Sequence, residues 1–204
     1  PWRDAHPRQP YHVSESEILR QQTPTETRKP YFHRWMEQFP TIRDLAQAPE
    51  DQVLRAWQGL GYYSRARNLH KAARQVMVEW DGQLPRDRKA LGDLPGIGAY
   101  TVGAILSMAF GEKVPAVDGN LLRVLARLYG VEEDITGTQG KKTITALAEA
   151  AIPADRPGDF NEAMMDLGAE VCIPKYARCG ECPLRESWRA LKEGKTAVLP
   201  VRKA

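Results

Sequence analysis

Alternating runs of Val, Ile and Thr, the pattern of a half-buried β-strand, are nearly absent from this sequence. The sequence also lacks an apolar run long enough to cross a membrane, because the most apolar stretch, residues 101–110, is short and contains Gly103 and Ser107. No secretory signal is recognisable. These absences argue against a β-rich protein and against a membrane protein.

An excess of charge of one sign is also lacking. The chain has 29 basic and 26 acidic residues, so its net charge is only +3. Such a balance permits binding to nucleic acid but does not indicate it, and the local arrangement of basic residues has to decide. Apolar residues make up 42% of the chain, which is ordinary for a globular protein with a buried core.

What the sequence does contain is apolar residues at helical spacing, separated by proline and glycine breakers. The pattern predicts helices over residues 14–22, 26–39, 50–57, 64–80, 87–92, 99–110, 118–129, 140–151 and 159–171. We therefore predict an all-α protein of many short helices.

Cysteine is scarce, and its few copies are clustered. The chain has three cysteines, Cys172, Cys179 and Cys182, within one short segment. An odd, clustered set does not suit a disulfide framework and favours metal binding in a reducing compartment. No histidine lies in this segment, which weakens the case for zinc.

Two glycines mark a candidate phosphate-binding turn. In Leu94–Thr101, which reads LPGIGAYT, Gly96 and Gly98 stand between two predicted helices. Glycines at this spacing allow a tight turn with exposed N–H groups, and the start of the next helix adds a positive dipole end. The segment is therefore either a helix–hairpin–helix element that holds DNA phosphates or an ordinary turn between helices.

Two acidic residues allow both a chemical and a structural interpretation. Ser14-x-x-Glu17 has the spacing of a capping box, so Glu17 is either a catalytic acid or part of a helix start. Asp118 follows an apolar run and precedes a predicted helix, so it is either functional or an N-cap.

Several of these motifs occur together in one known group of proteins. The hairpin LPGIGAYT, the segment VDGN at 117–120 and the cysteine cluster resemble the endonuclease III superfamily of DNA glycosylases. Residues 59–70 and 160–169 are similar to the adenine DNA glycosylase branch, MutY. The resemblance covers nearly the whole chain.

The resemblance implies a two-lobed helix–hairpin–helix glycosylase fold. Residues 12–121 would form a six-helix barrel, and residues 1–11 and 122–204 a terminal lobe with an iron–sulfur cluster. The partner would be double-stranded DNA in which an adenine opposite 8-oxoguanine or guanine is flipped into a pocket. We further expect a monomer located in the cytoplasm, associated with the bacterial nucleoid.

The resemblance also implies catalytic roles. Glu17 takes the place of the acid that protonates adenine N7, and Asp118 that of the carboxylate that stabilises the oxocarbenium-like sugar. Tyr100 occupies the position where bifunctional relatives carry a Schiff-base lysine. We therefore expect a monofunctional glycosylase without an efficient strand-cleaving step, in which Tyr100 positions the sugar and Glu17.

Gln21, Gln22 and Glu162 match family positions at the DNA and the adenine pocket. The segment with Tyr62, Arg65 and Arg67 interleaves aromatic and basic residues, as a nucleic-acid surface does, with a solvated surface as the alternative. The predicted DNA-binding residues are Gln21, Gln22, Tyr62, Arg65, Arg67, Gly96 and Gly98, and the predicted base-pocket residues are Arg3, Arg20 and Glu162. Glu162 also stands at capping-box spacing from Asp159, which favours a structural role instead.

The chain departs from the family pattern at the metal site. Cys172, Cys179 and Cys182 match three cluster ligands, but Trp188 stands where the fourth cysteine is expected. The alternatives are a cluster with an unusual fourth ligand, a three-iron cluster, a zinc site or no metal. We expect a [4Fe-4S] cluster with this incomplete ligand set.

A second departure lies next to the predicted acid. Relatives are mostly apolar at the positions of Ser14, Glu15 and Arg20, and a cation near Glu17 favours its ionised form. Arg20 therefore keeps two alternatives open: removal of thymine from G·T mispairs, and a DNA-binding protein with impaired catalysis.

Overall fold

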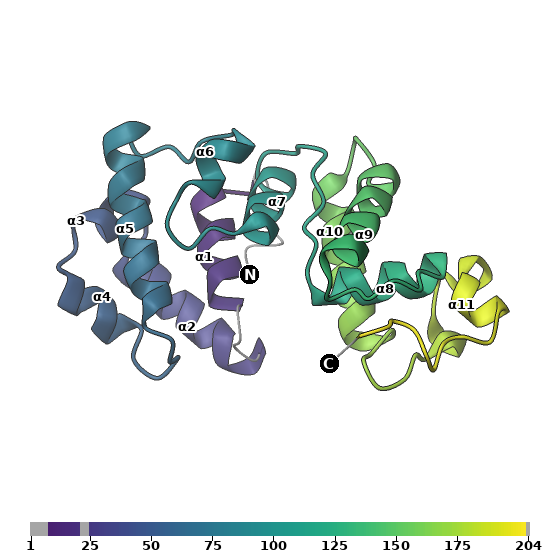
Figure 1. Cartoon of the computed structure of the whole chain (residues 1–204). Coiled ribbons are helices and arrows are strands. Elements are labelled where there is room, and N and C mark those ends of the chain that lie inside the picture. Colours follow the sequence, from purple (N-terminus) through teal and green to yellow (C-terminus); the bar gives the residue numbers. More distant parts are fainter. Residues whose placement is uncertain (1–7, 21–24, 203–204) are drawn as a thin grey trace. The chain divides into compact units, whose positions relative to one another are not determined.

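Every regular element of the described chain is helical (Figure 1). The computed structural model describes residues 8–20 and 25–202. The predicted all-α fold is thus confirmed for this part of the chain. Two compact units follow one another, the first ending at Phe110 and the second beginning at Gly111. The expected boundary lay at residue 121, and the pairing of residues 1–11 with the C-terminal residues stays a prediction.

The first unit contains helices α1 to α7. Their bounds are α1 Pro10–Arg20, α2 Thr25–Gln38, α3 Ile42–Gln47, α4 Glu50–Ala56, α5 Ser64–Glu79, α6 Arg88–Gly92 and α7 Ala99–Met108. Helix α5 packs against α3 and α4, while α1 packs against α2 and α7. The buried rings of Trp35, Phe39 and Trp57 meet edge to face, with centroids 4.9 and 5.4 Å apart, and form the aromatic part of the core.

Helix α1 begins at Pro10, earlier than the predicted residue 14. Ser14 therefore lies inside the helix, where its hydroxyl donates to the carbonyl of Tyr11 at 2.8 Å. A capping box needs its serine at the helix start, so the predicted box of Ser14 and Glu17 is wrong. Proline suits the first helical turn, because the N–H that it lacks would have no intrahelical partner there.

Helix α3 was not predicted, although its sequence carries a start signal. Thr41 accepts a hydrogen bond from the Asp44 amide at 3.2 Å, and the Asp44 carboxylate accepts one from the Thr41 amide at 3.0 Å. This is a capping box with aspartate in place of glutamate. The helix is short, and the prolines at 40 and 49 that flank it obscure its apolar period.

The second unit is built around one central helix. Its helices are α8 Gly119–Tyr129, α9 Thr138–Ala151, α10 Pro157–Glu170 and α11 Arg189–Lys192, with short 3-10 turns at Cys179–Glu181 and Arg185–Ser187. Helix α8 packs against α9, α10 and α11. Since α10 begins at Pro157, Asp159 lies within its first turn and the predicted capping box with Glu162 is wrong.

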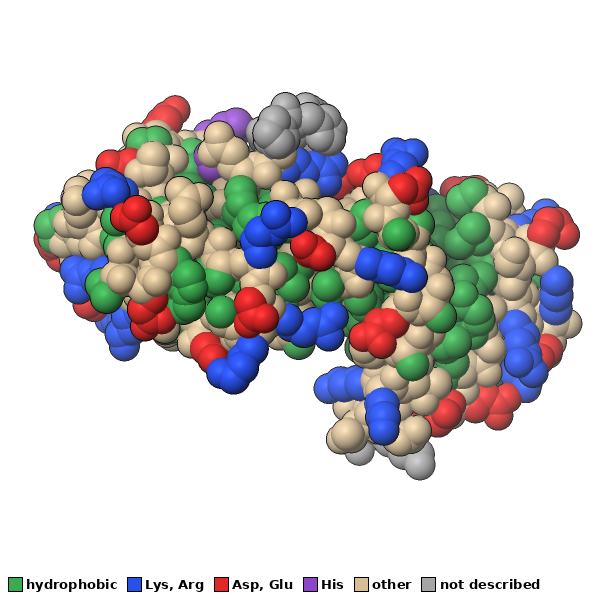
Figure 2. Space-filling model, turned by 90° about the horizontal axis from the view of Figure 1, so that it is seen from above, with side chains coloured by type: hydrophobic (Ala, Val, Ile, Leu, Met, Phe, Trp, Pro, Cys, Tyr) green, Lys and Arg blue, Asp and Glu red, His purple; other side chains and the backbone are tan. Residues whose placement is uncertain are grey.

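Charged side chains of both signs are interspersed over the face shown in Figure 2, without one large basic area. This distribution agrees with the small net charge of +3. No helix in the described ranges has the length and apolar character needed to span a bilayer.

Candidate active site

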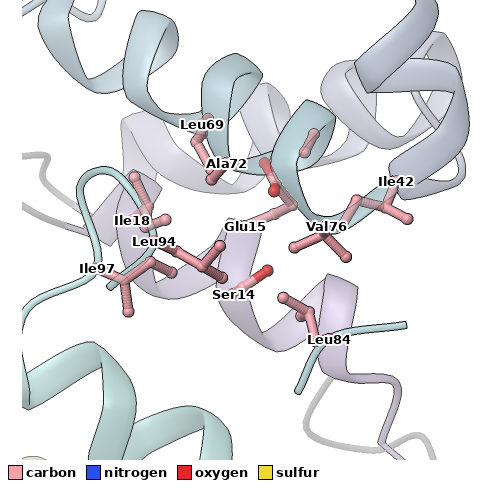
Figure 3. A pocket seen from close by; sticks show the side chains of 11 residues that line it. Ser14, Glu15, Ile18, Ile42, Leu69, Ala72, Val76, Leu84, Leu94 and Ile97 are labelled. Carbon is pink, nitrogen blue, oxygen red and sulfur yellow. The ribbon is translucent and has the colours of Figure 1, made fainter. Parts of the chain in front are cut away.

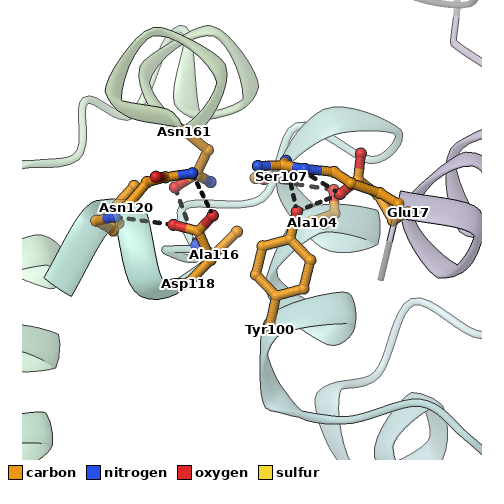
Figure 4. A network of polar contacts seen from close by, with 10 residues as sticks. Glu17, Tyr100, Ala104, Ser107, Ala116, Asp118, Asn120 and Asn161 are labelled. Carbon is orange, nitrogen blue, oxygen red and sulfur yellow. Dashed lines mark hydrogen bonds and ion pairs between the residues drawn. The ribbon is translucent and has the colours of Figure 1, made fainter. Parts of the chain in front are cut away.

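Three polar side chains of the first unit meet where α1 packs against α7 (Figure 4). Glu17 is only 2% exposed, and its Oε2 accepts a hydrogen bond from the hydroxyl of Tyr100. Arg20 Nη1 donates to the same hydroxyl at 2.9 Å and lies 3.5 Å from Glu17 Oε2. The structure thus brings together three residues that were predicted separately, and it presents Glu17 as a hydrogen-bond acceptor.

The local sequence explains why these three groups meet. Glu17 and Arg20 are three residues apart on α1, so their side chains lie on the same helix face. Tyr100 is the second residue of α7, and the turn before it is anchored in the core by the buried side chains of Leu94 and Ile97. The hairpin therefore determines where the Tyr100 hydroxyl lies.

Glu15 has a different environment from Glu17, although it is only two residues away. Its side chain is 2% exposed, and Oε2 has no hydrogen-bond partner. Together with Ser14 it borders a cavity of about 20 Å³ whose other walls are apolar, among them Leu69 and Val76 (Figure 3). Burial raises the pKa of Glu15 to about 8, and the nearby indole of Trp35 opposes this only in part.

The glycine hairpin lies between α6 and α7 with both predicted glycines exposed. Gly96 has a φ of 77°, and Gly98 forms the N-cap of α7 without a side-chain hydrogen bond to the helix start. Apart from Gly98 and its two chain neighbours, no described heavy atom lies within 4 Å of the position that a Cβ of Gly98 would occupy. A ligand can therefore approach the first amides of this ten-residue helix closely.

Arg65, a predicted DNA-binding residue, makes internal hydrogen bonds. Its guanidinium donates to the carbonyl of Ile18 at 3.3 Å and to that of Leu60 at 3.2 Å. These bonds connect the loop before α5 to helix α1, which carries Glu17. Arg65 thus supports the candidate site, and its contact with DNA stays a prediction.

The other two predicted residues of this loop and helix face outward. Tyr62 is 64% exposed and has a φ of 46°, a left-handed conformation that is rare for a tyrosine. Arg67 forms an exposed ion pair with Glu50, with 3.3 Å between Nε and Oε1. Both side chains are accessible, and their contacts with DNA stay predictions.

In the second unit, Asp118 caps helix α8. Its Oδ1 accepts from the amide of Leu121 at 2.8 Å, and its Oδ2 accepts from the side-chain amide of Asn120 at 3.1 Å (Figure 4). The N-cap interpretation of Asp118 is therefore confirmed. The residue is half-buried, and capping uses one carboxylate oxygen, so a catalytic role for the other is compatible with this geometry.

Asn161 holds the segment that leads to Asp118, a role that the sequence analysis missed. This fully buried side chain accepts from the amide of Ala116 at 2.9 Å and donates to the carbonyl of Val114 at 3.0 Å. The available signal in the sequence was the position of Asn161, which stands at helical spacing from Met164, Met165 and Gly168. The adjacent Glu162, a predicted pocket residue, is also buried on α10.

Three predicted site residues, Arg3, Gln21 and Gln22, lie outside the described residues.

The cysteine segment does not form a four-thiolate site. Within residues 8–20 and 25–202, no three His, Cys, Asp or Glu side chains gather closely enough to hold a metal. Cys172 Sγ accepts a hydrogen bond from Arg127 Nη1 at 3.3 Å, and burial raises the pKa of the Cys172 thiol. Trp188, at the expected position of the fourth ligand, is 1% exposed. Three thiols and an indole do not fit a [4Fe-4S] cluster, which takes four thiolates.

The first unit thus combines an all-α fold, a Gly-x-Gly hairpin at the start of α7 and a buried carboxyl that accepts a hydrogen bond from that helix, which is the arrangement of a helix–hairpin–helix protein. The family profile described as "HhH-GPD superfamily base excision DNA repair protein" matches residues 16–152. The chain therefore belongs to this family.

One curated relative and two solved structures show which members of the family the chain is similar to. The chain is 43% identical to the adenine DNA glycosylase of Mus musculus over 199 residues, which cover 96% of this chain and 39% of the mouse protein. Among solved structures, a thermostable thymine-DNA glycosylase is 30% identical with a TM-score of 0.83, covering 95% of this chain and 88% of its own. A non-covalent endonuclease III–DNA complex is 25% identical with a TM-score of 0.78, covering 94% and 88%. The chain spans about two fifths of the length of the mouse relative.

Proposed function

We propose that this chain is the catalytic core of a monofunctional DNA glycosylase that hydrolyses the N-glycosidic bond of adenine mispaired with 8-oxoguanine or guanine. The observation that carries the proposal is the buried carboxyl of Glu17, held by Tyr100 next to the glycine hairpin. The similarity to an adenine DNA glycosylase over almost the whole chain supports this choice of base.

The proposed chemistry requires an acid, because adenine is a poor leaving group until a ring nitrogen is protonated. A protonated Glu17 delivers this proton to N7, while Tyr100 keeps the carboxyl in one orientation. Departure of the base leaves an oxocarbenium-like sugar, which the carboxylate of Asp118 stabilises before water adds. A tyrosine at position 100 cannot form a Schiff base, so strand cleavage does not follow.

The proposed partner is double-stranded DNA. Exposed backbone amides at Gly98 and at the start of α7 are suited to a phosphate, which positions the duplex without reading its sequence. Tyr62 and Arg67 provide an exposed aromatic ring and an exposed cation on the same unit. Both groups suit a nucleic-acid surface.

A second candidate, removal of thymine from G·T mispairs, is favoured by Arg20. Arg20 Nη1 lies 3.5 Å from Glu17 Oε2 and donates to the hydroxyl of Tyr100, so a cation stands beside the candidate catalytic carboxyl. A departing thymine carries negative charge, and a guanidinium can stabilise it without prior protonation. The similarity to a thymine-DNA glycosylase agrees with this alternative.

Single-turnover base release would test the proposal. Duplexes with 8-oxoguanine·A, G·A and G·T would be incubated with the wild-type chain, with Glu17→Gln, and with Glu15→Gln as the matched control on the same helix. We expect adenine release that falls at least about 100-fold in Glu17→Gln, and that Glu15→Gln retains. Equal losses in the two variants would contradict a chemical role for Glu17.

Arg20→Leu separates the two candidates in the same assay. If adenine is the substrate, removing the cation next to Glu17 raises adenine release. If thymine is the substrate, the variant loses thymine release. Duplex binding without release of either base would instead indicate a DNA-binding protein without catalysis.

A further inference from the structure

Because the residues at the cysteine segment do not fit a [4Fe-4S] cluster, the second unit needs other interactions to hold this segment in place. The segment around Cys172 follows α10 and contains little regular structure, yet Cys172 and Cys182 are buried. Buried backbone of this kind needs hydrogen-bond partners. Two arginines of α8 provide them.

Arg127 of α8 connects two other segments of the backbone. Its side chain is buried, and Nε donates to the carbonyl of Leu199 at 2.7 Å. Nη1 donates to the carbonyl of Ile173 at 2.9 Å and to Cys172 Sγ at 3.3 Å, and Nη2 donates to the carbonyl of Pro174 at 3.3 Å. One guanidinium therefore ties the residues after α10 to the residues near the C-terminus.

Arg123, one helical turn earlier on α8, performs the same task at the end of α10. Nε donates to the carbonyl of Cys172 at 2.7 Å, and Nη2 donates to the carbonyl of Gly168 at 2.7 Å. Nη2 also donates to Asn120 Oδ1 at 2.8 Å. The planar guanidinium has enough donors to satisfy several carbonyls at once.

Trp188 adds a large buried side chain to the packing of the second unit. Its indole is among the largest fully buried side chains of the described chain. It stands where the family pattern has a metal ligand, and it precedes α11, which packs against α8. A large buried side chain here contributes packing that a ligand to a cluster would not.

We propose that the second unit is held together by Arg123, Arg127 and the buried Trp188 in place of a metal cluster, and that the chain folds and keeps its stability without iron. The proposal concerns structure and does not depend on which base the proposed glycosylase removes.

The first test is the metal content of the full chain, expressed with added iron and cysteine and purified without oxygen. We expect iron, zinc and acid-labile sulfide far below one per chain, and a melting temperature that a metal chelator leaves unchanged. Stoichiometric iron and sulfide, or one zinc per chain, lost in Cys179→Ser together with stability, would overturn the proposal.

The second test compares two arginines of the same unit. Arg127→Met is expected to lower the melting temperature by about 10 °C, because it removes the donors that several buried carbonyls need. The control is Arg156→Met, which removes an exposed arginine paired with Asp159 and should change little. Equal melting temperatures for the two variants would refute the role of Arg127. If Arg127→Met is insoluble, Arg127→Lys, which keeps the charge but not the fork of donors, takes its place.

Discussion

At the scale of single residues, two buried glutamates on helix α1 have different surroundings. Glu17 has a hydrogen-bond partner in Tyr100 and an adjacent cation in Arg20. Glu15 has an unpartnered Oε2 and a mostly apolar cavity. Residues two positions apart on a helix point to different sides, so neighbouring carboxyl groups experience different surroundings.

Glu15 should make the stability of the chain depend on pH. Its pKa is raised from 4.5 to about 8 in the folded state, so the folded state binds a proton that the unfolded state has released. The contribution of the protonated form is complete below about pH 4.5, and it is lost as the pH rises through about 8. We expect the free energy of unfolding to fall across this window by at most about 1.4 kcal/mol per pH unit.

Urea unfolding at several pH values, on the wild-type chain and on Glu15→Gln, would check this expectation. The glutamine keeps the size of the side chain but does not titrate, so the difference between the two curves isolates Glu15. Parallel curves from pH 5 to 8 would contradict the prediction.

At the scale of elements, the two glycines of the hairpin before α7 differ in backbone conformation and in the space around them. Gly96 has a φ of 77°, and a Cβ there would lie 2.9 Å from the Cβ of Asn68. Gly98 has a φ of −90° and open space around it. The first glycine is therefore needed by the fold, whereas the second leaves room for a phosphate.

Alanine substitutions should separate these tasks. Gly96→Ala should lower the free energy of unfolding by about 1–3 kcal/mol, since its backbone conformation and its contact with Asn68 both disfavour a side chain. Gly98→Ala should leave stability nearly unchanged but weaken duplex binding, because its methyl group occupies the phosphate approach. Thermal melting and fluorescence anisotropy would measure the two effects, and unchanged duplex affinity in Gly98→Ala would exclude the hairpin as a phosphate site.

The start of a helix could be predicted only where the capping-box spacing had a single interpretation. Thr41 and Asp44 have the spacing of a capping box and stand at the start of α3. Ser14 and Glu17 have the same spacing but lie inside α1. Spacing alone cannot tell a helix start from a helix interior, because both present residues three apart on one face. The extension of α1 back to Pro10 decided between them.

At the scale of the whole molecule, the small net charge of +3 predicts a moderate electrostatic contribution to DNA binding. Each phosphate neutralised by Lys or Arg adds about −0.9 to the slope of log affinity against log salt concentration. With basic and acidic side chains interspersed on the visible face, we expect a slope shallower than about −5 (Figure 2).

Equilibrium binding of Glu17→Gln to a duplex with an 8-oxoguanine·A pair, measured over a range of salt concentrations, would give this slope. The variant is used so that the substrate is not consumed during the measurement. A much steeper slope would contradict the prediction and would indicate an extended basic surface outside the face shown in Figure 2.

The sequence alone determined the all-α class and the glycine hairpin, because periodicity and turn residues are local properties of the chain. Its resemblance to the family, in turn, indicated Glu17 and Tyr100 as candidate catalytic residues. Tertiary packing decided the rest. It joined Arg20 to Tyr100 across 80 positions of sequence, it placed the Arg65 guanidinium against α1, and it buried the side chain of Trp188. These outcomes depend on which side chains meet in space, and burial and hydrogen bonding between distant segments are not encoded in any local pattern.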